Sequence, residues 1–137
     1  MSTELYRLLT SDDALSEGRI DVEAVLNNID TASLNIKAGN GNFPIHAAAI
    51  LPNAGSALII IREMIATGAD VNCFNDSNRT PLHMVITTFE HHESIEVIKL
   101  LLENGANSLI EDENGVKFLD IAKPEILELL HSYKKTI

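Results

Sequence analysis

A period of 37 residues runs through the chain, and it limits the possible folds more than any other feature. Pro44 and Pro81 are 37 residues apart, and so are His46 and His83. The same interval relates three further sets of residues: Gly68 and Gly105, Ala69 and Ala106, and Gly41, Asn78 and Gly115. Several landmarks with one common period indicate a repeated supersecondary unit that stacks on its own copies.

Each landmark has a conformational reason. A proline at the first helical position lacks an N–H that would have no partner there, and Thr80 before Pro81 is a suitable N-cap. Gly41 and its equivalents are residue types that tolerate the positive φ of a tight turn. Gly68 and its equivalent follow apolar runs, where a left-handed C-cap is expected. One repeat therefore reads as turn, short helix, connection, second helix and glycine stop.

The spacing of apolar residues predicts helices between these landmarks. Residues 94–104 carry an apolar stripe at helical spacing, and residues 57–67 carry another. The first helices, 44–50 and 81–87, have small or slim residues on one side, which lets a neighbouring helix approach closely. Aromatic residues make up only 4% of the chain and tryptophan is absent. An aliphatic core of this kind favours packed helices over a β-sandwich.

The repeated sequences FPIHAAA and TPLHMVI, each followed by an apolar helix and Gly-Ala, resemble the ankyrin-repeat family. That family has a T-P-L-H-x-A pattern and a period of about 33 residues. The resemblance implies an all-α solenoid of stacked helix-turn-helix units in a single domain, residues 1–137. We expect a degenerate N-terminal repeat at 1–38, repeats at 39–75 and 76–111, and a C-terminal capping repeat at 112–137. Helices are predicted at 4–9, at 21–29 and from Pro124 onward.

The chain departs from the family pattern in three places. The longer period places four extra residues between the two helices of a repeat, at 51–56 and 88–94. Either the helices are about one turn longer, or these segments form a ridge that contacts a partner. Phe43 replaces the usual threonine, so no hydroxyl can bond the imidazole there. Phe118 and Asp120 replace the proline and histidine of the fourth repeat.

The sequence offers little for catalysis or cofactor binding. It lacks a glycine-rich phosphate loop and the G-x-S-x-G turn, and no nucleophile lies beside a base. The resemblance gives His46 and His83 a structural role within each repeat. His91 and His92 have no third and fourth ligand at convincing spacing, so no metal site is predicted. We therefore expect neither an enzyme nor a cofactor-binding protein.

The formal net charge is −10, from 20 acidic and 10 basic residues. Such a surface repels phosphate backbones, which argues against nucleic-acid binding. It would attract a basic protein partner. The alternative is that the charge only keeps the protein soluble.

Other features bear on the compartment. The single cysteine, Cys73, is read as a packed thiol and favours a reducing compartment. The first residues do not resemble a signal peptide, and the most apolar stretch, 57–66, is too short to span a bilayer. We expect a monomeric, cytoplasmic protein, with delivery into a host cell as an effector left open.

The resemblance implies a protein-binding module that uses its concave face and turn tips. Phe74 would then be either an exposed aromatic anchor or a side chain packed between adjacent turns. The role of the whole protein would be that of an adaptor, a scaffold or an effector. The alternative is an inhibitor or immunity protein that occludes a basic enzyme or toxin. The residues expected to contact a partner are Gly39, Asn40, Asn42, Ile50, Leu51, Phe74, Asp76, Ser77, Arg79, Thr87, Thr88, Phe89, His91, His92, Glu113, Asn114 and Val116.

Overall fold

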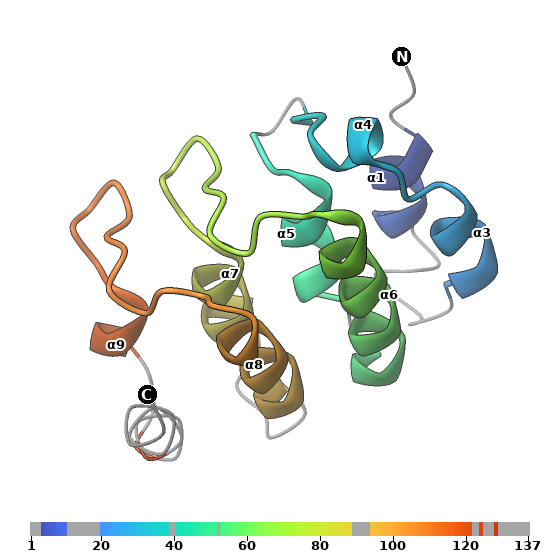
Figure 1. Ribbon diagram of the computed structural model, residues 1–137. Helices are drawn as coiled ribbons and strands as arrows, with labels where there is room; N and C mark the ends of the chain where they lie inside the picture. Colours follow the sequence, from blue (N-terminus) through green and yellow to red (C-terminus); the bar gives the residue numbers. More distant parts are fainter. Residues whose placement is uncertain are drawn as a thin grey trace.

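The computed structural model describes residues 4–10, 20–38, 41–51, 53–88 and 94–121, together with positions 124 and 128 (Figure 1). In these ranges the secondary structure is helical, apart from one isolated antiparallel bridge between Glu111 and Lys117. The helices are α1 (Glu4–Leu9), α3 (Val22–Asn27), α4 (Thr31–Leu34), α5 (Pro44–Ala49), α6 (Ala54–Thr67), α7 (Pro81–Thr88), α8 (Ser94–Glu103) and α9 (Phe118–Ile121).

The helices pack in two rows. The first helices of the repeats form one row, in which α1 contacts α5, α5 contacts α7, and α7 contacts α9. The second helices form the other row, in which α3 contacts α6 and α6 contacts α8. Within a repeat, α5 packs on α6 and α7 packs on α8, so the two rows form the layers of a solenoid (Figure 1). The predicted all-α stack is confirmed.

The turn and stop residues have the predicted conformations. Gly41, Asn78 and Gly115 have φ values of 89°, 58° and 75°, and Asn78 is the one non-glycine residue with positive φ in the described ranges. At the end of α6, Gly68 has φ 112° and donates its N–H to the carbonyl of Ile65. The repeat period therefore corresponds to a repeated backbone geometry.

The extra residues of the two middle repeats lengthen different helices. In the first of these repeats α6 begins at Ala54, three residues before the predicted start, because the side chain of Asn53 caps it by accepting the N–H of Ser56. In the next repeat α7 extends to Thr88 and has 8 residues, compared with 6 in α5. Residues 89–93 lie outside the described ranges, so the ridge proposed for 88–94 stays a prediction.

The N-terminal helices α1 and α3 lie where the sequence predicts them. The short helix α4 was not predicted, because its four residues are too few to show an apolar period. A capping box starts it: Asp30 accepts the N–H of Ser33, and the Ser33 hydroxyl accepts the N–H of Asp30. The helix predicted from Pro124 onward lies almost wholly outside the described residues.

The core is largely aliphatic, with the ring of Phe118 also fully buried, and it is continuous between the layers. Fully buried side chains such as Ile60, Leu82 and Ile98 come from three different helices. In α5 the residues at 47–49 are buried alanines, which allow α1 and α7 to approach closely on either side. Replacing a buried leucine or isoleucine of this core with alanine costs about 2–5 kcal/mol in comparable proteins.

Candidate protein-binding surface

Two buried histidines join each repeat to the next one. His46 accepts the backbone N–H of Phe43 at Nδ1 (3.1 Å), and its Nε2 lies 2.9 Å from the carbonyl oxygen of Arg79. Because Nδ1 accepts, Nε2 carries the proton and donates it. His83 repeats this arrangement with Thr80 (3.1 Å) and with the carbonyl of Val116 (2.9 Å). Burial lowers the pKa of His46, and its hydrogen bonds to Arg79 and Phe43 only partly offset this effect. The predicted structural role of both histidines is confirmed.

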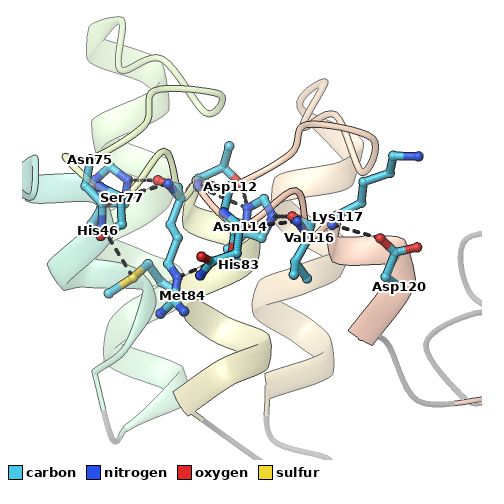
Figure 2. Close-up of polar contacts among 12 residues, drawn as sticks. His46, Asn75, Ser77, His83, Met84, Asp112, Asn114, Val116, Lys117 and Asp120 are labelled. Atoms are coloured by element: carbon cyan, nitrogen blue, oxygen red, sulfur yellow. Dashed lines mark hydrogen bonds and ion pairs between the residues drawn. The ribbon is translucent and has the colours of Figure 1, made fainter.

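The substituted positions keep part of this pattern. Thr80 also brings its hydroxyl to 2.9 Å from His83 Nδ1, whereas Phe43 has no hydroxyl and stacks its ring on His46, with centroids 6.1 Å apart. In the fourth repeat Asp120 takes the histidine position, and its carboxylate accepts the N–H of Lys117 at 3.0 Å (Figure 2). The starts of α5, α7 and α9 are therefore each fixed by a side chain three residues after the cap.

Three turn loops project from the stack ahead of the first helices (Figure 1). We call residues 38–42, 75–79 and 112–116 fingers 1, 2 and 3; residues 39 and 40 of finger 1 lie outside the described ranges. In finger 2 the side-chain oxygen of Asn75 accepts the N–H groups of Ser77 (2.9 Å) and Arg79 (3.0 Å). In finger 3 Asp112 accepts those of Asn114 (2.8 Å) and Val116 (3.0 Å) (Figure 2). These bonds hold the pKa of Asp112 below its ordinary value.

The roles of Asn75 and Asp112 were not predicted from the sequence. The signal was present, because Asn and Asp commonly bond the backbone two residues ahead at a turn, and both residues lie three positions before a residue with positive φ. The corresponding residue of finger 1 is Ala38, which has no such group.

Further hydrogen bonds join the fingers into one row. The side-chain amide of Asn75 donates to the Asn42 oxygen at 2.8 Å, which connects fingers 1 and 2. The N–H of Glu113 donates to the carbonyl of Ser77 at 2.9 Å, which connects fingers 2 and 3. These hydrogen bonds between neighbouring fingers fix the distance from one finger to the next before any partner binds.

Charged side chains add contacts along the row. Lys37 lies 2.6 Å from Asp76, with its ammonium 6.0 Å from the centroid of the Phe43 ring. Arg79 Nε lies 3.7 Å from the largely buried carboxylate of Asp112. The Lys37 pair is about half exposed, so it contributes at most about 1 kcal/mol.

The structure places the expected contact residues in different environments. Phe74 is 56% exposed, so its ring is not packed between adjacent turns. Asp76, Glu113 and Asn114 are exposed, whereas Leu51 is 2% exposed within the core and has no surface to offer a partner. The partly buried members are Asn42, Ile50, Ser77, Arg79 and Val116. Thr87 and Thr88 end α7, and Gly39, Asn40, Phe89, His91 and His92 lie outside the described residues.

The single cysteine of the chain is not activated in this setting. The thiol of Cys73 is partly buried, and burial, together with the Asp70 carboxylate, raises its pKa to about 12. A protonated thiol is a poor nucleophile.

Within the described ranges, no group of three or more potential metal-ligating side chains is found. None of the helices in these ranges is long and apolar enough to cross a membrane.

Comparison with known proteins agrees with this geometry. A family model described as ankyrin repeats in three copies matches residues 13–112. The chain belongs to the ankyrin-repeat family. Among curated proteins, the ankyrin repeat and LEM domain-containing protein 1 homolog of Caenorhabditis elegans is 35% identical to this ankyrin-repeat chain over 75 residues. The match covers 55% of the chain and 10% of that relative, so the chain spans only a small part of the relative's length.

Membership in the family carries a general functional statement. Ankyrin repeats are protein–protein interaction modules, and the family is typically non-catalytic. The ankyrin scaffold found here has the geometry for that role, because a rigid stack presents turn residues at regular intervals.

Proposed function

We propose that this ankyrin-repeat chain binds a protein partner through its concave face and the tips of its fingers. The observation that carries the proposal is the row of fingers, whose backbone groups are bonded within and between repeats while selected side chains stay exposed. A surface fixed in this way loses little conformational entropy on binding, so more of its contact energy appears as affinity.

The exposed side chains are of the kinds found in protein interfaces. Phe74 offers an aromatic ring from the segment that enters finger 2. Asp76 adds a carboxylate to finger 2, and Glu113 and Asn114 add a carboxylate and an amide to finger 3. Together they describe a surface with one apolar anchor and several polar groups around it.

The charge of the chain favours a basic partner. The formal charge is −10, and an acidic surface accelerates association with a basic protein by long-range attraction. This observation supports the second candidate function, an inhibitor or immunity protein that occludes a basic enzyme or toxin. The affinity of such an inhibitor falls steeply with added salt, whereas an adaptor that depends on an apolar anchor shows a weak salt dependence.

Charge reversal at the fingertips tests the proposal. A variant with Asp76→Lys and Glu113→Lys is compared with one carrying Glu23→Lys and Glu63→Lys on exposed helix positions of α3 and α6, which changes the net charge equally. Proteins captured by wild type from native lysate are quantified by mass spectrometry, and the strongest candidate is purified for calorimetry. We expect the finger variant to lose binding and the helix variant to retain it.

Both variants are also checked by circular dichroism for helix content. Equal binding by wild type and the folded finger variant would reject the fingertips as the binding surface. Unfolding of the finger variant would assign Asp76 and Glu113 a structural role instead, and single neutralisation of Glu113 to glutamine would then test binding alone.

A further inference from the structure

A surface hollow of about 190 Å³ lies beside fingers 2 and 3, lined by Phe74, Asn78, Ile110 and Glu111. An inference from it rests on the proposed function, because it concerns what part of a protein partner occupies this place. Small-molecule sites usually enclose about 300–1,000 Å³. The hollow is therefore sized for one side chain and not for a cofactor.

The repeat places different chemistry at three equivalent positions, two of which line the hollow. Residues 37, 74 and 111 share one position of the 37-residue period, and they are lysine, phenylalanine and glutamate. All three are exposed. Phe74 contributes an aromatic wall and Glu111 a carboxylate, while Asn78 adds an amide whose oxygen can accept a hydrogen bond.

Near the hollow, the carboxylate of Glu111 is available to bind a positively charged group. The two basic side chains at the fingers have acidic neighbours, Lys37 with Asp76 and Arg79 with Asp112. Lys117 is paired with Glu111 through a backbone bridge, but no ion pair joins their side chains. Among the described residues, no basic side chain lies within ion-pair distance of Glu111.

We propose that this hollow accepts an arginine side chain of the protein partner. A guanidinium stacks favourably on an aromatic face and binds a carboxylate through two parallel hydrogen bonds. Phe74 and Glu111 supply both groups at one site, Ile110 contacts the methylene stem, and the Asn78 oxygen accepts a remaining N–H. Lysine satisfies the charge but lacks the planar donor pair, so arginine binds more tightly.

The test uses three short peptides and NMR spectroscopy of the full chain. The probes are acetyl-Gly-Arg-Gly-amide, its citrulline analogue, which keeps the shape without the charge, and its lysine analogue. We expect saturable shifts of the backbone amides at Phe74, Asn78, Ile110 and Glu111 with the arginine peptide. Binding of the citrulline peptide should be weaker by about tenfold, the usual effect of losing a charged hydrogen bond.

Variants separate the two proposed contacts. Glu111→Gln removes the carboxylate, and Phe74→Leu keeps an apolar side chain but removes the ring. Each should weaken arginine binding by about tenfold or less. Glu63→Gln on the exposed side of α6 removes the same charge elsewhere and should leave the binding unchanged.

Three results would overturn the proposal. One is the absence of saturable shifts at the hollow at millimolar arginine peptide. Another is equal binding of the arginine and citrulline peptides, which would make the hollow an apolar subsite. The last is equal, widespread shifts with arginine and lysine, which would indicate attraction by the acidic surface alone. The test of the proposed function changes Asp76 and Glu113 and leaves Phe74 and Glu111 intact, so the two hypotheses can fail separately.

Discussion

Asn75 is the residue at which the row of fingers can be tested most directly. Its side chain accepts the N–H groups of Ser77 and Arg79 and donates to the Asn42 oxygen, and its amide also lies 3.9 Å from the Met84 sulfur. The residue is 9% exposed. A typical hydrogen bond contributes about 0.5–1.5 kcal/mol net. We therefore expect Asn75→Ala to lower the free energy of unfolding by about 2–4 kcal/mol.

Asn75→Asp provides the matched control. An aspartate keeps the oxygen that accepts both backbone N–H groups, as Asp112 does in finger 3, and loses the amide donor to Asn42 and its long contact with the Met84 sulfur. The expected loss is about 1 kcal/mol from the missing bond, plus the electrostatic effect of one added charge. The two variants should therefore differ clearly if the bonds within the finger dominate.

Urea unfolding followed by circular dichroism measures both losses from the midpoint and slope of the transition. A loss below about 0.5 kcal/mol for Asn75→Ala, the size typical of surface substitutions, would refute the reasoning. So would equal losses in the two variants, because the bond to Asn42 would then account for the whole effect.

Three further predictions follow, two from glycines with positive φ and one from a buried imidazole. Gly105→Ala should cost about 1–2 kcal/mol, the penalty of a left-handed conformation, because no atom lies within 4 Å of the added Cβ. Gly41→Ala should cost more, since its Cβ would lie 2.5 Å from the Asp76 side chain. The double variant with Asp76→Ala should recover part of the lost stability when the midpoints of thermal unfolding are compared. The pKa of His46 is lowered from 6.5 by folding, so the unfolded chain binds protons more readily and stability falls as the pH drops below that value. His46→Gln should show a weaker dependence when unfolding midpoints are compared one pH unit above and below 6.5; an unchanged dependence would assign the effect to other groups.

The starts and ends of the helices in the repeats could be predicted from the sequence because each depends on a single residue. Pro44 and Pro81 each begin a helix, where the N–H that proline lacks would have had no partner. Gly68 ends a helix because glycine tolerates the positive φ found there. These effects act within one or two residues, so a repeated pattern is enough to locate them.

The environment of individual side chains could not be predicted in the same way. Leu51 was expected at the surface, but it follows the end of α5 and is enclosed by the core, which only the packing of neighbouring helices decides. Whether Phe74 was exposed was also open, because its setting depends on the next repeat. The start of α6 was misplaced by three residues because Asn53 was not recognised as its cap.

The bonds between repeats have a consequence for protein engineering. His46 bonds Arg79, Asn75 bonds Asn42 and His83 bonds Val116, and each pair is separated by 33 residues. With repeats bounded at 39–75 and 76–111, the His46–Arg79 and His83–Val116 pairs cross from one repeat to the next, so a single repeat moved into a foreign scaffold would leave its histidine without an acceptor. A portion that is transplanted with these bonds intact therefore includes the finger of the following repeat.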